Sequence, residues 1–391
     1  MKIYEIGTGY TPIPAQVAAA TESVVEELAK AYMAMNQPVE IIDISSKNRA
    51  PHKLPITEVK VPSVFTKSDV SLGLIHKLKR VVYSVCLAFK LKKILKKSSD
   101  KPVLHFHNQY NLFFFTKLVS ERLRAKAVVA YTNHNGMWSL PWEDVKDTLH
   151  KRYFQEISAM KSADLVFVLN SATKKTVEEQ LGIDSEKVVL ISNGVNTDVY
   201  CPLSETEKTE SKKKYGLSDK KIILQVGSVY ENKGQARAIE KLAPMLKSNP
   251  DTVYAFVGGI VSQEYFDFTM KKAKELGVDG QVRYLGSVAP NEEMNSLYNM
   301  AHATVFASEY EGFPLVCVES VSAGIPVIVC SDINVNIAEG CVSAASGKDV
   351  EEIINSVEYK TLCLAARKNA VKNLTWQAVA ERYLNCFQKV K

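Results

Sequence analysis

The sequence predicts an α/β protein of two doubly wound domains, each with a parallel sheet between layers of helices. Short apolar, β-prone segments alternate with longer amphipathic segments along the whole chain, which is the pattern of strands and crossover helices in such folds. This series ends near residue 195 and starts again at Lys221. A chain of 391 residues is also long enough for two domains, each with its own core.

The composition is that of an ordinary globular protein, with 46% apolar and 24% charged residues. The net charge of +6 suits a phosphate-bearing ligand or an anionic membrane surface and does not indicate nucleic-acid binding. No run of about 18 apolar residues occurs, so we expect no membrane span. The seven cysteines are scattered, and the start of the chain lacks the apolar core of a signal peptide. We therefore expect a cytoplasmic protein with neither a disulfide framework nor a zinc site.

In the first half of the chain, a long helix is predicted from about Ala15 to Met35, and the last strand of the domain is expected within 162–171. The strands before it are predicted at residues 3–7, 39–44, 103–108 and 127–132.

Polar residues stand at the ends of three of these strands. Gly7 ends the first strand, His107 lies at the end of the third, and His134 follows the fourth. Ligands of open parallel sheets bind at the carboxyl ends of strands, so we expect these three residues to line one site. Gly-Thr-Gly at 7–9 could also open a dinucleotide-binding fingerprint, but Pro12 occupies the third glycine position and argues against it.

Residues 72–97 form a segment that is apolar in its middle and basic at its ends. Eight Lys or Arg residues and no acidic residue lie between His76 and Lys97. One interpretation is a helix whose basic face, at 76–97, docks peripherally on an anionic membrane that carries a lipid-linked acceptor. The other is a core-facing helix or helix pair with solvated lysines.

A turn signal at Asn193-Gly194 and a polar, lysine-rich stretch at 202–219 mark the boundary between the domains. We place the first domain at 1–195, the second at 196–372 and a terminal helix at 373–391. In the second domain, strands are predicted at 221–227, 253–258, 282–288, 303–307 and 327–330. Helices are predicted from about residue 233 and at 291–300, 316–323, 346–357, 362–373 and 377–391.

The stretch 308–320 carries the strongest functional signal. It follows an apolar strand and runs into a helix that ends at Gly324. The free amides and the dipole at a helix start favour anions. Glu311 in the loop and Glu319 in the helix, with seven residues between them, offer carboxylates that can accept hydrogen bonds from a vicinal diol. The stretch therefore predicts a ligand that has both a phosphate and sugar hydroxyls.

Several strings in the chain resemble motifs of the retaining glycosyltransferases of family 4. Glu-Gly-Phe-Pro-Leu-Val at 311–316 and Glu-Ser-Val-Ser-Ala-Gly-Ile-Pro-Val-Ile at 319–328 are similar to the donor-site motif of that family. Tyr-Thr-Asn-His-Asn-Gly at 131–136 resembles its histidine loop, and Gly-Ser-Val-Tyr-Glu-Asn-Lys-Gly at 227–234 resembles its glycine-arginine loop. The resemblance covers nearly the whole chain. It implies the GT-B architecture, with two facing Rossmann-like domains and a last helix that crosses back to the first.

The resemblance implies transfer of a sugar from a nucleotide sugar, UDP-linked by family frequency, with retention at the anomeric carbon and without a metal or other cofactor. The implied acceptor is a glycan or a lipid-linked glycan, as in surface polysaccharide biosynthesis. The predicted catalytic residues are Lys233, which would neutralise the leaving phosphate, Glu311, which would contact sugar hydroxyls, and His134, which would position the sugar from the opposite domain. Glu319 would hold the ribose hydroxyls. The predicted donor-binding residues are Gly227, Ser228, Lys233, Gly286, Glu311, Gly312, Phe313, Pro314, Leu315 and Glu319.

The chain departs from the family pattern at two places. Ser228 stands where the family usually has an arginine, and residues 15–22 lack the usual glycine pair, although Glu22 fits the acid of that loop. Either Lys233 suffices for the diphosphate, or Arg237 substitutes for the missing cation, or activity is reduced. These departures keep two rival functions open: a non-catalytic glycosyltransferase-like binding or assembly protein, and a GT-B sugar-nucleotide epimerase.

Overall fold

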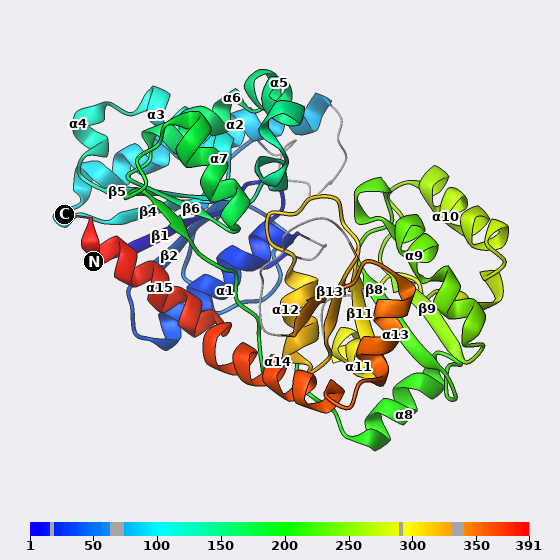
Figure 1. Cartoon of the computed structure of the whole chain (residues 1–391). Coiled ribbons are helices and arrows are strands. Elements are labelled where there is room, and N and C mark those ends of the chain that lie inside the picture. The colour runs from blue at the N-terminus through cyan, green and yellow to red at the C-terminus, as the bar shows by residue number, and fades with distance from the viewer. Residues whose placement is uncertain (16–18, 63–73, 289–291, 331–339, 391) are drawn as a thin grey trace. The chain divides into compact units, whose positions relative to one another are not determined.

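The computed structural model describes residues 1–15, 19–62, 74–288, 292–330 and 340–390. The chain divides into two compact units, Met1–Asn193 with Trp376–Lys391 and Gly194–Thr375, which we call the first and the second unit. Each unit contains one parallel sheet with helices on both of its faces (Figure 1). The chain returns to the first unit only for its last helix.

The sheet of the first unit has seven parallel strands in the order β3-β2-β1-β4-β5-β6-β7. The strand order therefore reverses between β1 and β4, as in doubly wound folds. The strands are β1 (Ile3–Ile6), β2 (Val39–Ile44), β3 (Ile56–Val59), β4 (Val103–Phe106), β5 (Val128–Asn133), β6 (Leu165–Val168) and β7 (Val188–Leu190).

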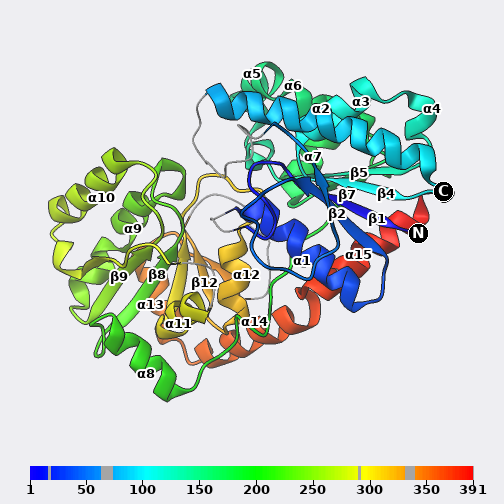
Figure 2. The ribbon, with the colours of Figure 1, turned by 180° about the vertical axis from the view of Figure 1, so that it is seen from behind.

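Two layers of helices cover this sheet, and the two views show them on opposite faces (Figures 1 and 2). The layer on one face consists of α1 (Ala20–Ala34) and α15 (Trp376–Lys389), which pack against each other. The layer on the other face consists of α2 (Leu74–Lys97), α3 (Gln109–Leu118), α4 (Glu121–Arg124), α5 (Trp142–Arg152), α6 (Phe154–Ser162) and α7 (Ser171–Leu181).

The alternation of side chains along the strands decides which layer each residue meets. On β4, Leu104 and Phe106 belong to the main core beside buried residues of α2 and α3. His105 between them points to the other face, where its ring lies 5.0 Å from the ring of Tyr383 of α15. The α15 face thus contains polar residues of the central strands as well as apolar ones.

The second unit repeats the architecture with six parallel strands in the order β10-β9-β8-β11-β12-β13. Its strand order reverses between β8 and β11. The strands are β8 (Lys221–Val226), β9 (Thr252–Val257), β10 (Val282–Tyr284), β11 (Ala303–Phe306), β12 (Val327–Val329) and β13 (Cys341–Ser343).

The helices of the second unit also form two layers (Figure 1). One layer consists of α9 (Gln235–Ser248), α10 (Gln263–Glu275) and α13 (Gly347–Asn355). The other consists of α8 (Glu205–Lys214), α11 (Glu292–Met300), α12 (Leu315–Ser322) and α14 (Tyr359–Asn373). Capping boxes start two of these helices, Ser204 with Glu207 in α8 and Ser346 with Asp349 in α13.

The predicted fold class is confirmed, because both sheets are parallel and doubly wound. The strand within 162–171 is not the last of its sheet as predicted, since β7 pairs with β6 beyond it. The sequence also missed β3 and β13, which are short edge strands. Helix α1 begins at Ala20 rather than near Ala15. Residues 16–18 lie outside the described residues.

Candidate active site

Each unit brings polar strand ends together where its strand order reverses. In the second unit, β8 and β11 are neighbours, so the loops that follow them, residues 227–234 and 307–314, start side by side. In the first unit, β1 and β4 are neighbours in the same way. Ligands of open α/β sheets bind at such reversal points. The residues singled out from the sequence lie at both of these points.

Asn232 joins the two loops of the second unit. Its backbone carbonyl accepts a hydrogen bond from the amide of Glu309 (2.9 Å), and its side-chain amide donates to the carbonyl of Tyr310 (3.1 Å). The side-chain oxygen of Asn232 accepts from the amide of Tyr310 (3.3 Å). Asn232 itself is buried, and its two side-chain bonds are partly buried, so they are partly shielded from water. They hold the residues that follow on the two loops, Lys233 and Glu311, close to each other.

Lys233 and Glu311, two of the three predicted catalytic residues, form an ion pair. Their side chains keep 22% and 18% of their surface exposed, so the pair is accessible from solvent. Gln225 of β8 supports it by donating to the carbonyl of Lys233 (2.7 Å), and the hydroxyl of Tyr254 donates to Gln225 (2.6 Å). The lysine is therefore held by its backbone as well as by its charge.

Glycines allow the loops that follow β8, β9 and β11 to approach one another closely. Gly234 has a φ of +69°, and a Cβ there would lie 2.3 Å from the carbonyl oxygen of Ala307. A Cβ at Gly258 would lie 2.1 Å from the carbonyl oxygen of Gly227. The amide of Gly258 donates to the carbonyl of Gly286 (2.8 Å). The predicted donor-binding glycines 227 and 286 are thus drawn together through Gly258 after β9.

Arg237 lies against the loop that follows β11. Its guanidinium donates to the carboxylate of Glu309 (2.7 Å) and to the carbonyl of Ala307 (3.0 Å). Ser228, which stands where the family has its arginine, is partly buried, and its carbonyl accepts from the side chain of Gln235 (3.1 Å). Arg237 is therefore at the edge of the same site but engaged with protein groups.

Helix α12 starts directly after the second loop, with Pro314 as its N-cap residue, whose side chain makes no capping hydrogen bond. Of the predicted donor-binding residues here, Phe313 and Leu315 pack against the core of the unit, and Gly312 precedes them. The start of α12 is thus the helix terminus at which the sequence predicts an anion site, and that assignment stays a prediction.

Glu319 projects from the second turn of α12 and is oriented by tyrosines. The hydroxyl of Tyr298, a buried residue of α11, donates to the Glu319 carboxylate (2.7 Å). Burial raises the pKa of Glu319, and hydrogen bonds from Tyr298 and Tyr200 oppose that rise. The carboxylate is thus held in one orientation and keeps lone pairs for a ligand.

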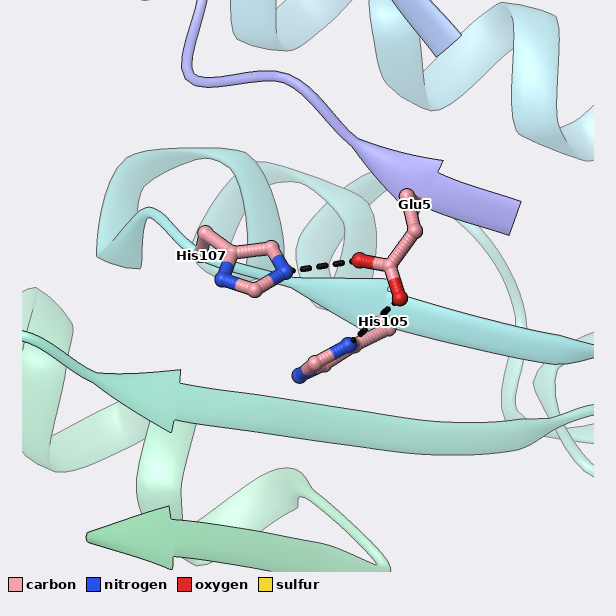
Figure 3. A group of neighbouring side chains, drawn as sticks. All are labelled: Glu5, His105 and His107. Carbon is pink, nitrogen blue, oxygen red and sulfur yellow. Dashed lines mark hydrogen bonds and ion pairs between the residues drawn. The ribbon is translucent and has the colours of Figure 1, made fainter. Parts of the chain in front are cut away.

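In the first unit, His107 and His134 are in contact. Nδ1 of His107 lies 3.0 Å from Nε2 of His134, and Nε2 of His107 lies 2.7 Å from the carboxylate of Glu5. The other oxygen of Glu5 lies 3.0 Å from Nδ1 of His105, so the carboxylate bridges the two histidines (Figure 3). Gly7 lies at the same strand end, where its carbonyl accepts from Asn111 (3.0 Å).

Glu5, His105 and His107 are also ligand types that divalent transition metals use. Their ligand atoms lie within 4.8 Å of one another. Here these atoms pair with each other, and a metal ion would have to replace both hydrogen bonds to Glu5. The absence of a metal requirement stays a prediction of the family resemblance.

Sequence reasoning missed Asn232, Tyr298 and Glu5. Glu5 carries a signal that could have found it, because a carboxylate inside an apolar strand needs a buried partner. Tyr298 and Asn232 carry no such signal, since their partners are set by the packing of different elements.

Two family models match consecutive parts of the chain. The model described as Glycosyltransferase Family 4 matches residues 21–199, and the model described as Glycosyl transferases group 1 matches residues 207–339. Together they cover most of both units.

Among curated proteins, the chain is similar to the D-inositol 3-phosphate glycosyltransferase of Corynebacterium aurimucosum, with 23% identity over 63% of this chain and 61% of that protein. It is also similar to the GDP-mannose-dependent alpha-(1-6)-phosphatidylinositol monomannoside mannosyltransferase of Mycolicibacterium smegmatis, with 28% identity over 54% and 53% of the two chains. The matches thus span less than two thirds of the length of either relative.

Among solved structures, the chain resembles Anabaena Alr3699/HepE in complex with UDP and glucose, with a TM-score of 0.71, 16% identity and full coverage of both chains. It also resembles the sucrose-phosphate synthase of Thermosynechococcus elongatus, with a TM-score of 0.72, 18% identity and coverage of 100% and 98%. At these identities the likeness shows the fold, and the predicted GT-B architecture is confirmed.

Proposed function

Since the chain belongs to family 4 of the glycosyltransferases and has the GT-B fold, we propose that it moves a sugar from a nucleotide-sugar donor to a glycan or lipid-linked acceptor. The observation that carries this proposal is the Lys233–Glu311 ion pair, which lies where the second sheet reverses its strand order and where the loop leads into α12. A cation, the start of a helix and two carboxylates there match the phosphates and hydroxyls of one ligand.

In the proposed complex, the diphosphate replaces Glu311 as the partner of Lys233. The ammonium and the amides at the start of α12 offset the charge that grows on the leaving phosphate. Glu311, released from Lys233, accepts hydrogen bonds from sugar hydroxyls. Glu319 accepts from the ribose hydroxyls, and Tyr298 keeps its carboxylate in place. Every one of these groups belongs to the second unit.

The proposed reaction proceeds with retention by a front-face mechanism. The bond from the anomeric carbon to the diphosphate oxygen breaks, and a bond to the acceptor oxygen forms on the same face of the sugar. The acceptor proton passes to the departing phosphate, so no dedicated carboxylate base is needed. Lys233 and the helix start supply the positive charge that a metal ion would otherwise supply.

The donor that we propose is a UDP-sugar. The solved structure with UDP and glucose supports uridine, whereas the relative named for GDP-mannose makes guanosine the second candidate. The Tm of the protein, measured in buffer with a chelator and with a panel of UDP, GDP, ADP and the corresponding nucleotide sugars, shows which base the protein binds. Ligand at a hundred times its dissociation constant adds roughly 2.7 kcal/mol to the native state, so we expect a rise in Tm of several degrees with one base only.

Other results of that panel would point to the rival functions. If no nucleotide stabilises the protein, the non-catalytic interpretation replaces this proposal. If a nucleotide sugar binds and is then converted to free nucleotide diphosphate and an inverted sugar without an acceptor, the protein is the epimerase.

We propose further that α2 docks on an anionic membrane that carries a lipid-linked acceptor. One face of α2 belongs to the core through Tyr83, Leu87, Leu91 and Leu95, as the core-facing interpretation required. The rest of the helix exposes Leu78 (53%) and Phe89 (50%) together with several lysines. Apolar and basic groups on one exposed helix are typical of interfacial binding. No helix within the described residues has the length and apolarity needed to span a bilayer.

The lysines at the end of α2 test this surface. Exposed Lys93, Lys96 and Lys97 replaced together by glutamine should lower binding to anionic vesicles on the order of a hundredfold, because each lysine near the surface contributes about 1 kcal/mol. Flotation with vesicles of anionic or neutral lipid measures this. The matched control replaces three exposed lysines of the second unit, Lys213, Lys274 and Lys360. Equal losses in both variants, or binding that ignores anionic lipid, would contradict membrane docking.

A further inference from the structure

A buried network of hydrogen bonds links His134 to a carboxylate that the proposed reaction does not use. It runs from Nε2 of His134 to Nδ1 of His107 (3.0 Å) and from Nε2 of His107 to Glu5 (2.7 Å). The second oxygen of Glu5 meets Nδ1 of His105 (3.0 Å), and Nε2 of His105 meets the hydroxyl of Thr132 (2.7 Å). The network extends from within the central strands β1, β4 and β5 of the first sheet to the carboxyl end of β5, where His134 lies.

Glu5 and His105 are fully buried and His107 is nearly so, whereas His134 at the end of the network is partly exposed. Burial alone would raise the pKa of Glu5, but the two histidines outweigh it and bring the pKa down to about 2. Burial, together with His105, lowers the pKa of His107 to about 4, although Glu5 opposes this. Burial also lowers the pKa of His134 well below its usual range.

With Glu5 ionised and the imidazoles neutral, these contacts determine which ring nitrogens of His107 and His134 carry a proton. An ionised Glu5 can only accept, so Nε2 of His107 carries a proton and donates it to the carboxylate. A neutral imidazole has one proton, so Nδ1 of His107 is then an acceptor. His134 must donate to it from Nε2. Its only proton is used in this bond, and its own Nδ1 is left with a lone pair.

We propose that Glu5 is a positioning residue that acts through His107 to hold His134 in its Nε2–H tautomer. His134 then presents Nδ1 to the substrate as a hydrogen-bond acceptor. Such a nitrogen accepts from a sugar hydroxyl and repels a phosphate oxygen, so the network selects which part of a nucleotide sugar His134 contacts. This role for His134 rests on the proposed function, whereas the tautomer itself does not.

The tautomer is tested on the wild-type protein without any ligand. Long-range ¹H–¹⁵N spectra of ¹⁵N-histidine-labelled protein distinguish protonated from unprotonated ring nitrogens, and the spectrum of a His134→Asn variant assigns the signals of His134. We expect a single neutral form with the proton on Nε2. A proton on Nδ1 of His134, or a doubly protonated ring at pH 7.5, would overturn the proposal. Either result leaves nucleotide binding in the second unit untouched.

Variants of Glu5 test the origin of the tautomer. Glu5→Leu removes both acceptor oxygens, and Glu5→Gln keeps one of them. We expect mixed tautomers of His134 in Glu5→Leu. Asp43→Asn is the matched control, because Asp43 is also a fully buried carboxylate of this sheet but pairs with Arg49. It should lower Tm without changing the His134 signals. An unchanged tautomer in a folded Glu5→Leu protein, or a loss of tautomer order in Asp43→Asn as well, would contradict the role of Glu5.

Kinetics test what Nδ1 of His134 contacts. With the donor that the nucleotide panel identifies, analogues that carry fluorine in place of one sugar hydroxyl at a time cannot donate a hydrogen bond. One analogue should lower kcat/KM about tenfold or more in the wild type and have no further effect in His134→Ala. Equal losses in both proteins for every analogue would reject the contact.

A zinc titration tests the rival interpretation of these residues as a metal site. Binding of one zinc ion per chain that is lost in Glu5→Gln would show a metal site in place of the network.

Discussion

Replacing Lys233 by alanine is expected to lower kcat by about 10²–10³, the effect of removing one preorganised group that stabilises transition-state charge. The structure adds a reason for a large effect, because Lys233 is held by its backbone and by Glu311 beside the proposed anion site. The loss should fall on kcat more than on KM if the ammonium meets charge that develops on the leaving phosphate. Release of nucleotide diphosphate at saturating donor measures it.

Arg237→Ala is the matched comparison for that experiment. Its guanidinium is engaged with Glu309 and the carbonyl of Ala307, so we expect a smaller loss of kcat than in Lys233→Ala. Equal losses would mean that Arg237 substitutes for the arginine that Ser228 replaces. An unchanged kcat in Lys233→Ala would remove this residue from the catalytic set.

Replacing Glu319 by alanine is expected to raise the Kd for the nucleotide diphosphate by roughly a hundredfold or more. The reason is that each of two hydrogen bonds to a charged group contributes about 1.5–3 kcal/mol. Calorimetric titration of wild type and variant with the diphosphate identified by the panel measures this change. Because Glu319 is oriented by tyrosines rather than exposed on the helix surface, the carboxylate needs little ordering when the ligand binds.

Tyr298→Phe is the control that separates orientation from direct contact. It removes one hydroxyl that holds Glu319 and leaves the carboxylate itself in place. We expect a Kd about tenfold above that of the wild type, between the values for wild type and Glu319→Ala. If Glu319→Ala binds the diphosphate with unchanged affinity, the assignment of this residue to the ribose is wrong.

Most of the fold could be predicted from the sequence because most of its strands are short apolar runs. Strands in the centre of a parallel sheet are buried on both faces and therefore need such runs. This holds for β2, β4, β8, β9 and β11, all of which the sequence placed. The three strands that it missed or misjudged, β3, β7 and β13, lie at the edges of their sheets. An edge strand has one neighbour, and here it has only three or four residues, so its sequence carries little of the apolar pattern.

The residues of the second unit that we assign to the donor were also visible in the sequence. Lys233, Glu311 and Glu319 stand in continuous strings, and the loop-to-helix geometry of the proposed anion site follows from those strings alone. The sequence did not show that Lys233 and Glu311 pair in the free protein or that Tyr298 orients Glu319. Those contacts join residues that are 78 and 21 positions apart.

Glu5 shows most clearly what the tertiary structure decided. In the sequence it is one acidic residue within Ile3–Ile6, and nothing nearby in the chain can hold its charge. The parallel register of β1 and β4 places Glu5 opposite His105, 100 residues away, and brings His107 to its second oxygen. The register between two strands depends on how the side chains of both strands pack in the folded sheet. The local propensity of either strand alone does not determine it. The sequence by itself therefore determined the fold and the motif residues, and the packing of distant strands decided how His134 is held.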